Sequence, residues 1–578
     1  MTSYTKKFKD CFSEQSMRLA WERYIRSTQK EGKDYLGISI YELDLENMLK
    51  KLSKKIISGH FGKLLRYPPK FCKPKPSGMQ RTISILPIDD ALFFQAIANL
   101  VACNGYKKLS RNNDFVLGYV LNEEVSLGNK LLRKKDANYF LFEGYHKNYK
   151  KFADSTSQEF RKAKVKFKLE TDLTGFYDTI PHYNLLSVLA DDFGVSSDIL
   201  ELLEELLNVW SGTSDGPTPG VGIPQSCDSS HLFANIYLHY IDEKIMARGI
   251  SYFRYMDDIC IFGYKKSELL ETLTDLDFRM KSRGLCLNSE KTKIVEIHID
   301  QKKDEQNEFR HFIYHENRDI QSEDIEDLYS TSSHISSDVV DQSATGDYEI
   351  DRNDQELLYG SNFTNEDILK LAREDLEKIV SELPDLVQKI KEEVRKPEPD
   401  KRILNLALQI GHRFRVAQSV INNCTGGYEL FKTKTRNHWL ILASILFWRI
   451  DQFCWILNLY NDDKIVKKGL LKILENNQQY EWVRSEVLSS LVQSQSFSIK
   501  ELREQFFPML KKEESWYAKR YIYKLILTNC RDKNLFNSIL IAAEDEDYGP
   551  LQREILFFST LWKDGDSRSK QLVDIFDK

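Results

Sequence analysis

The stretch that most constrains the fold of this chain is a strand-like segment with two adjacent acids. Residues 251–263 read Ser-Tyr-Phe-Arg-Tyr-Met-Asp-Asp-Ile-Cys-Ile-Phe-Gly, so aromatic and β-branched residues flank Asp257 and Asp258 on both sides. Such flanks favour strands, and we expect the acids in the turn of a β-hairpin. Most Asp-Asp pairs lie in solvated surface turns. Between apolar flanks, however, two carboxylates are costly unless a cation binds them, so this pair predicts a metal site.

A third candidate carboxylate, Asp172, lies at the end of another strand-like segment. Residues 167–178 read as a strand that runs into a turn and a helix. In-line phosphoryl transfer to a nucleotide requires two magnesium ions bridged by carboxylates from neighbouring strands, one to activate the attacking 3′ oxygen and one to clamp the triphosphate. Magnesium prefers one or two carboxylates, substrate phosphates and water as ligands.

Three motifs in one order resemble those of the reverse transcriptase family. Tyr-Met-Asp-Asp at 255–258 resembles the family's signature, and Asp172 with Phe-Tyr-Asp at 176–178 resembles its first catalytic motif. Gly-Ile-Pro-Gln-Ser at 222–226, followed by Leu-Phe-Ala-Asn-Ile-Tyr-Leu at 232–238, resembles the motif between them. The shared order and plausible gaps make the resemblance far more specific than any single motif.

The resemblance implies an α+β fold with the fingers and palm of a right-hand polymerase, followed in this chain by an all-α region. It implies that Asp172, Asp257 and Asp258 are the catalytic residues and bind two Mg²⁺ ions, with Mn²⁺ as a possible replacement. It also implies dNTPs as substrates, an RNA template or a non-coding RNA as a partner, and DNA as the product.

Five further residues match positions that bind substrate in this family. Lys75 and Arg81 flank a tight turn that resembles the fingers hairpin, and both are expected to bind the triphosphate, although Lys75 could equally contact template backbone. Tyr177 matches the steric gate, a bulky ring that excludes a 2′-hydroxyl. Gln225 matches the residue beside the template base and incoming nucleotide. Lys291 matches a lysine near the triphosphate.

Two features bear on the alternatives within this resemblance. The family usually has a second glycine after the Gln225 position, and Ser226 stands there instead, which puts fine details of dNTP contact in question. Tyr177 argues against an RNA polymerase, because such enzymes tend to have a small or polar residue at the gate. A catalytically silent nucleic-acid-binding sensor on the same fold is another hypothesis, which the intact set of three acids disfavours.

Composition divides the 578 residues into four expected parts. We expect N-terminal helices and fingers at 1–165 and a palm at 166–315. Thirteen acids against two bases at 316–356 predict an acidic linker or insert at 316–360. Residues 361–578 read as helices and form a thumb-like or interaction domain. A step of about 34 residues between similar segments predicts stacked helical repeats, with a non-repetitive bundle as the alternative.

Basic residues are concentrated in the N-terminal third of the chain. No acid occurs between Glu46 and Asp89, and a second basic cluster with interleaved aromatic residues covers 120–165. On an acidic chain with a net charge of −5, this one-sided distribution predicts a surface for a polyanion. Residues 309–314 are a possible strand of a primer-grip hairpin. The bases of the first run are Lys50, Lys51, Lys54, Lys55, Lys63, Arg66, Lys70, Lys73, Lys75 and Arg81.

Cysteine usage and apolar runs predict a cytoplasmic location, and a resemblance to bacterial enzymes, given in the next paragraph, implies that the cytoplasm is bacterial. The nine cysteines include no Cys-x-x-Cys pair, which suits a reducing compartment, and the N-terminus has no apolar stretch typical of a signal peptide. The longest apolar run, at 439–448, is about half a membrane span and reads as a buried helix, so no membrane partner is expected.

Three kinds of reverse transcriptase could carry these motifs. A group II intron-type enzyme usually has a basic maturase region and often a nuclease with Cys and His ligands, which 361–578 lacks, and a retron-type enzyme is typically much shorter. A palm joined to a large helical region resembles the bacterial abortive-infection and other defence-associated reverse transcriptases. That resemblance implies a homo-oligomer or a partner protein, and priming either on a protein hydroxyl or on nucleic acid.

Overall fold

The computed structural model describes most of the chain, in two compact units. The first unit comprises residues 1–70 and 83–335, and the second comprises 71–82 and 336–578. The predicted strand at 309–314 and the acidic segment at 316–360 lie outside the described residues. The described ranges are 4–27, 31–61, 67–162, 164–213, 215–225, 227–297, 365–396, 399–425, 429–530, 532–546 and 549–560.

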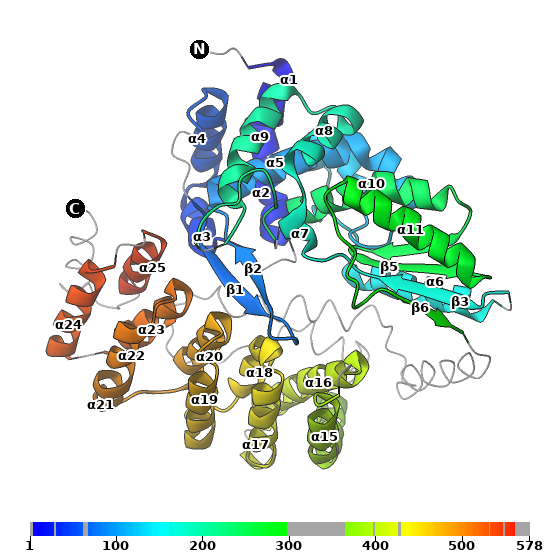
Figure 1. The fold of residues 1–578 in the computed structure, drawn as a ribbon. Coiled ribbons are helices and arrows are strands. Elements are labelled where there is room, and N and C mark those ends of the chain that lie inside the picture. Colours follow the sequence, from blue (N-terminus) through cyan, green and yellow to red (C-terminus); the bar gives the residue numbers. More distant parts are fainter. Residues whose placement is uncertain are drawn as a thin grey trace. The chain divides into compact units, whose positions relative to one another are not determined.

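The first unit begins with helices, as the sequence predicts. They pack on the long helix α5 (Ile88–Leu109), which is buried along most of its length and begins with two acids that suit the positive end of its dipole. Figure 1 shows α5 crossing the middle of this unit. The N-terminal helices are α1 (Lys6–Cys11), α2 (Glu14–Arg26), α3 (Tyr35–Leu43) and α4 (Leu45–Ile57).

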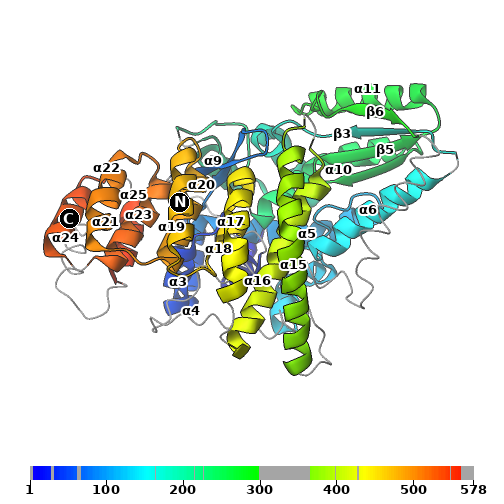
Figure 2. The ribbon, with the colours of Figure 1, turned by 90° about the horizontal axis from the view of Figure 1, so that it is seen from below.

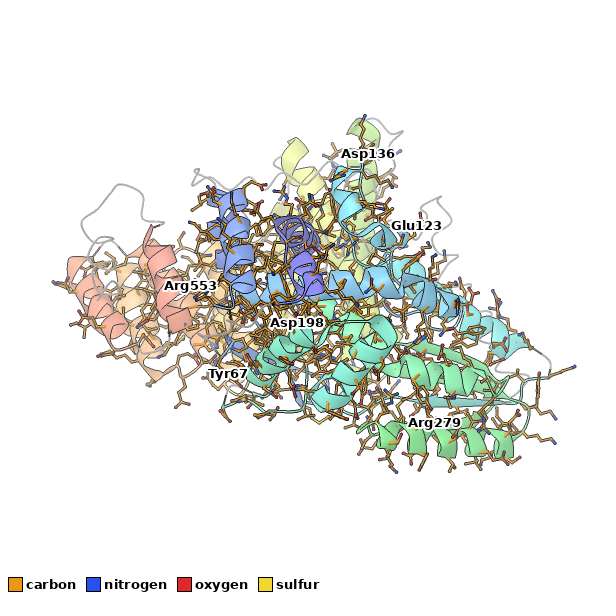
Figure 3. The ribbon with its side chains drawn as sticks, turned by 90° about the horizontal axis from the view of Figure 1, so that it is seen from above. Tyr67, Glu123, Asp136, Asp198, Arg279 and Arg553 are labelled. Atoms are coloured by element: carbon orange, nitrogen blue, oxygen red, sulfur yellow. The ribbon has the colours of Figure 1, made fainter. Side chains whose placement is uncertain are left out.

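A second group of helices joins this layer. Asp198, labelled in Figure 3, lies in the first turn of α9 (Ser197–Trp210). It accepts hydrogen bonds from the backbone N–H and the hydroxyl of Thr5, both at 2.8 Å. This links the start of α1 to the start of α9 across almost two hundred residues. The remaining helices of this group are α7 (Phe176–Thr179), α8 (His182–Phe193) and α9 (Ser197–Trp210), with the short η1 (Ser110–Asn112) and η2 (Glu123–Arg133) before them.

An antiparallel sheet in the order β4-β5-β3-β6 completes the first unit. Helices α10 (Asp228–Met246) and α11 (Lys266–Ser282) cover one face, and α6 (Tyr145–Arg161) covers the other; Figure 2 shows α11 and α6 on opposite sides of β3 and β5. The strands are β3 (Phe167–Thr171), β4 (Ser251–Tyr255), β5 (Asp258–Gly263) and β6 (Lys293–Glu296).

Side-chain alternation along β4 decides what each face of the sheet contacts. Tyr252 and Arg254 point to the α10 side, whereas Phe253 belongs to a small core on the α6 side. Phe152 and Phe160 of α6 pack on that core. Part of the aromatic content expected to stack on nucleic acid therefore serves to attach α6 to the sheet.

The second unit is a row of helices in which each packs mainly on the neighbours one and two places along the chain (Figure 1). This pattern is that of a helical solenoid. Trp482 and Trp516 stand at equivalent starts of α20 and α23, which matches the step seen in the sequence. The helices are α15 (Asn365–Glu393), α16 (Lys401–Thr425), α17 (Glu429–Ile445), α18 (Ile450–Leu457), α19 (Lys464–Asn476), α20 (Glu481–Ser494), α21 (Ile499–Glu501), α22 (Phe507–Lys512), α23 (Trp516–Asn529), α24 (Lys533–Glu544) and α25 (Gly549–Thr560), with the short η4 (Phe447–Arg449) and the π-helical η5 (Leu502–Phe506).

The apolar run at 439–448 is not the single buried helix expected. Leu446 leaves helical conformation, with φ −98° and ψ 48°, and α17 and α18 meet at a bend of 106°. Leu446 is itself buried, so the bend keeps this apolar residue in the core. Among the described helices, none alone has the length and apolar character of a membrane span, and only this bent pair meets that test jointly.

A β-hairpin, β1 (Lys70–Pro74) and β2 (Gln80–Ser84), confirms the strand–turn–strand expected around Lys75 and Arg81. Residues 71–82 belong to the helical unit rather than to the sheet unit. The Phe71 ring stacks on Tyr517 of α23, with centroids 4.0 Å apart and planes at 7°, and the Cys72 N–H donates to Glu481 Oε1 at 2.7 Å. The Lys73 ammonium lies 4.2 Å from the Trp482 ring centroid.

These contacts predict that the helices hold the hairpin. Replacing Tyr517 by Ala removes the stacking partner of Phe71, and we expect trypsin to cleave more rapidly after Arg81, the one basic residue of 71–82 that does not precede a proline, as measured by mass spectrometry. Tyr517→Phe keeps the ring and should cleave as the wild type does. Tyr521→Ala, on the same helix, is the matched control. Equal cleavage in Tyr517→Ala and Tyr521→Ala would contradict the docking.

Candidate active site

The two adjacent acids lie where the sequence predicts, at the tip of the β4–β5 hairpin. Tyr255 pairs with Asp258 across a turn formed by Met256 and Asp257. Met256 has φ 54°, in the left-handed region that a turn this tight requires. Asp258 opens β5 and is exposed, whereas Asp257 is half-buried.

A buried ion pair fixes the backbone of this turn. Arg254 and Asp242 are 0% and 1% exposed, and they are joined by two hydrogen bonds, Nε to Oδ1 at 2.7 Å and Nη2 to Oδ2 at 2.6 Å. The remaining guanidinium nitrogen donates to the Met256 carbonyl at 2.8 Å and to Asn235 Oδ1 at 2.9 Å. Tyr252 donates to Asp242 at 2.6 Å. Arg254 therefore holds the turn from beneath.

A glycine allows a second segment to support the same turn. The Leu117 N–H donates to the Arg254 carbonyl, and the Arg254 N–H donates to the Phe115 carbonyl, both at 2.8 Å. The next residue, Gly118, lies so close that a Cβ there would stand 2.5 Å from the Met256 nitrogen. Only glycine fits this approach. Asn235 donates to the Gly118 carbonyl at 2.8 Å, which connects this segment to α10.

The third carboxylate, Asp172, follows β3 and is 5% exposed. Its carbonyl accepts from the Asn288 N–H at 2.7 Å, and its Oδ2 forms an ion pair with the Lys291 ammonium. Its Oδ1 is buried and has no hydrogen-bond partner among the described residues. Burial works to lower the pKa of Lys291, but the hydrogen bond and charge of Asp172, with the charges of Asp258 and Asp257, raise it. All three carboxylates are therefore close to Lys291.

Electrostatics at this point favours a bound cation. Burial, then the charges of Asp172 and Asp258, raise the pKa of Asp257 to about 7. Carboxylates held together this way repel one another, and a divalent cation relieves that repulsion. The described residues contain no ready-made group of three or more metal-ligating side chains, so the site offers a close pair, Asp172 and Asp257, with Asp258 beside it. The unpartnered Oδ1 of Asp172 fits a metal ligand.

The Gly-Ile-Pro-Gln loop packs directly on the segment after Asp172. The Gly222 N–H donates to the Ile180 carbonyl at 2.8 Å, and the Ile223 N–H donates to the Tyr177 carbonyl at 2.9 Å. Gly222 has φ 90°, and a Cβ there would stand 3.2 Å from a backbone oxygen, which explains the glycine. The loop that carries Gln225 therefore lies against the segment that carries Tyr177, and the nucleotide contact of Gln225 stays a prediction.

The predicted triphosphate residues lie elsewhere in the chain. Lys75 and Arg81 are in the hairpin that belongs to the helical unit, where Arg81 is exposed and Lys75 is half-buried. The three carboxylates, Lys291, Tyr177 and Gln225 all belong to the first unit. The nucleotide contacts of Lys75 and Arg81 stay predictions.

The supporting residues of the site were missed at the level of sequence. Arg254 and Asp242 carried a usable signal, because each is a charge within an apolar segment at a position that faces the core. Two such charges of opposite sign suggest a buried pair. Asn235 and Gly118 carried no comparable signal, because their roles depend on neighbours that only the tertiary structure supplies.

Comparison with known protein families gives the class of this domain. Residues 73–316 match the family model described as reverse transcriptase (RNA-dependent DNA polymerase). The chain carries a reverse transcriptase domain. The chain is accordingly an enzyme of the nucleotidyltransferase class, with a palm-type sheet and an all-helical C-terminal region.

Solved structures with some likeness to this reverse transcriptase are fungal telomerases. Telomerase from Candida tropicalis in complex with a fragment of telomeric RNA is 13% identical to this chain, with a TM-score of 0.28. The matched region covers 71% of this chain and 68% of the telomerase chain. Telomerase from Candida albicans is 14% identical, covers 71% and 70%, and has a TM-score of 0.27. The chain spans 55% of a truncated Candida tropicalis telomerase. With TM-scores this low, the likeness carries no argument about activity. No curated protein matches the sequence.

Breaking the buried ion pair of the reverse transcriptase domain should be costly. In Asp242→Asn the Arg254 charge stays buried without its partner, and we expect a loss of about 3–5 kcal/mol in the free energy of unfolding, measured by urea denaturation. The control is Asp275→Asn, which removes the acid that pairs with Arg248 at 3.2 Å and with Arg279 at 3.0 Å on α11. These side chains are partly exposed, so its cost should stay below about 1 kcal/mol. Similar losses in both variants would contradict the assigned role.

The raised pKa of Asp257 predicts a pH-dependent response to metal. The folded state favours the protonated acid, so its contribution to stability is complete below the ordinary pKa of about 3.9 and is lost as pH rises through about 7. Mg²⁺ needs the ionised acid. We expect MgCl₂ to raise the melting temperature by about 2–4 °C at pH 8 and by less at pH 6. Asp257→Asn should lose most of this gain; an equal gain in that variant would rule out Asp257 as a ligand.

Proposed function

We propose that this reverse transcriptase synthesises DNA, adding dNTPs by two-metal phosphoryl transfer on an RNA template or, with a protein hydroxyl as first acceptor, without one. The observation that carries the proposal is the close approach of Asp172 and Asp257, with Asp258 beside them, a buried Asp172 oxygen that has no hydrogen-bond partner among the described residues, and a raised pKa at Asp257. A domain that only bound nucleic acid would gain nothing from this unfavourable arrangement.

Asp172 and Asp257 would hold the metal ions, assisted by Asp258. Bound Mg²⁺ would lower the pKa of the attacking hydroxyl and neutralise charge that develops on the phosphates. Lys291 already provides a positive charge at Asp172. With a metal ion held at Asp172, the Lys291 ammonium would be available to bind the triphosphate. This would require only a short movement, because the Lys291 side chain is 60% exposed.

Tyr177 and Gln225 would select the nucleotide. The Tyr177 ring would exclude a 2′-hydroxyl and so favour dNTPs over rNTPs, and Gln225 would lie beside the nascent base pair. Lys75 and Arg81 of the hairpin would bind the triphosphate oxygens, for which the planar guanidinium of Arg81 is suited.

A role in bacterial antiphage defence, in the cytoplasm, is the context we propose for this activity. Its support is the joining of a reverse transcriptase domain to a solenoid of helices, a kind of surface that binds partner proteins or further copies of the chain. This part of the proposal rests on analogy of architecture.

The decisive test is nucleotide incorporation by the purified full-length chain with its copurifying RNA. Each labelled dNTP is supplied with Mg²⁺, and products are run on denaturing gels before and after protease, RNase and DNase. We expect labelled DNA from the wild type and a loss of at least about a thousandfold in Asp257→Asn. Asp277→Asn removes a solvent-exposed acid of α11 paired with Lys281 and should be as active as the wild type.

The product controls separate the alternatives. Label that enters the gel only after protease treatment would indicate a protein primer, and loss of product after RNase pretreatment would indicate an RNA template. Full activity in Asp257→Asn would contradict the assignment of the metal ligands. Incorporation of rNTPs but not dNTPs would indicate an RNA polymerase, and no incorporation by the wild type would favour a silent sensor.

A further inference from the structure

The proposed gate is held at its far end by a histidine. The Tyr177 hydroxyl lies 2.5 Å from Nδ1 of His231, within hydrogen-bonding distance. The two rings are nearly perpendicular, at 83°, with centroids 5.5 Å apart. Tyr177 is 9% exposed and His231 is 6% exposed, so water has little access to this bond. His231 comes from the first turns of α10, whereas Tyr177 comes from α7, and the bond therefore connects separate elements.

His231 is itself held by a second tyrosine. Its ring stacks on Tyr119, with centroids 4.1 Å apart and planes at 10°. Tyr119 has φ 51°, a conformation that a bulky residue adopts only when its surroundings enforce it, and its ring packs edge-on against Phe142 at 5.0 Å. The preceding Gly118 is the residue that lies against the catalytic turn. The imidazole is thus held by two tyrosines, by the stacked ring of Tyr119 and by the hydroxyl of Tyr177.

We propose that His231 is a positioning residue for sugar selection, through its bond to Tyr177. The proposal rests on the gate role of Tyr177 given above. A ring excludes one extra hydroxyl only if it cannot move aside by a fraction of an ångström. A tyrosine ring can rotate about two side-chain torsions, and a hydrogen bond at its far end removes that freedom.

The chemistry of these contacts distinguishes this role from core packing. An apolar side chain at 231 would fill the same space without the cost of burying a polar imidazole. The bond to Tyr177 offsets part of that cost, and the stack on Tyr119 orients Nδ1 toward the hydroxyl. Selection of deoxyribose over ribose therefore depends on a residue that need not touch the nucleotide.

The experiment measures kcat/KM for one dNTP and for the matching rNTP with the full-length enzyme. His231→Ala and Tyr177→Phe each remove the hydrogen bond, and each should lower the preference for dNTP about five- to tenfold, the effect of one neutral hydrogen bond. Tyr177→Phe leaves no cavity, so it remains informative if His231→Ala folds poorly. The double variant should show no further loss, because both changes remove one interaction.

Two further variants separate positioning from general damage. His231→Asn keeps an acceptor near the place of Nδ1 and should retain most of the discrimination. His239→Ala is the matched control, since His239 is another buried histidine of α10 whose contacts are Asn112 and Glu243. Its discrimination ratio should equal that of the wild type.

Each outcome bears on a different claim. Tyr177→Ala should lose discrimination more severely than Tyr177→Phe; an unchanged ratio in Tyr177→Ala would overturn the gate itself. A lost ratio in Tyr177→Ala with an unchanged ratio in His231→Ala and Tyr177→Phe would overturn only the role of His231. Equal falls in dNTP and rNTP efficiency in His231→Ala would show a packing role and would likewise overturn it. No incorporation by the wild type would overturn both proposals.

Discussion

The buried pair of Arg254 and Asp242 is the interaction on which the geometry of the site depends. Burying two charges is expensive, and the two hydrogen bonds between them offset the expense only if both partners keep their positions. The remaining guanidinium nitrogen, Nη1, donates hydrogen bonds to the Met256 carbonyl and to Asn235 Oδ1. The turn that bears Asp257 is thus tied to the middle of α10. Small displacements of α10 would be transmitted to this turn through those hydrogen bonds.

The same helix connects the proposed metal ligands to the proposed sugar gate. Asn235 accepts from Arg254 and donates to the Gly118 carbonyl, and the residue after Gly118 stacks on His231. One turn of α10 therefore contacts the support of the catalytic hairpin, and the preceding turn contacts the gate. This arrangement explains why α10 is buried almost all round and why several of its polar residues, among them His231 and Asp242, are buried. Apolar residues lie on nearly all sides of α10, so its sequence lacks the pattern of an amphipathic surface helix, because the helix contacts both elements.

The sequence predicted the parts of the site that local chemistry determines. The β4–β5 hairpin, the placement of Asp172 after a strand and the loop at Gly222 all follow from flanking residues and turn chemistry, and the structure has them at those positions. What failed to emerge depends on long-range packing. The sequence of residues 71–82 does not indicate that they pack with helices some four hundred residues later, because that packing depends on distant partners that include Glu481, Trp482 and Tyr517.

Asp242 and Asp172 differ in whether their buried oxygens are hydrogen-bonded, and the difference bears on function. In the first unit, Asp242 of α10 accepts three hydrogen bonds from Tyr252 and Arg254 of β4, whereas Asp172 keeps an oxygen without one. Both acids are buried, at 1% and 5% exposed, so burial alone does not explain the difference. Asp242 faces a fixed guanidinium and acts as structure. Asp172 faces another carboxylate and an ammonium on a flexible stem, partners that a cation can replace without disturbing the backbone. The contrast between the two acids is therefore the physical argument that one supports the site and the other belongs to it.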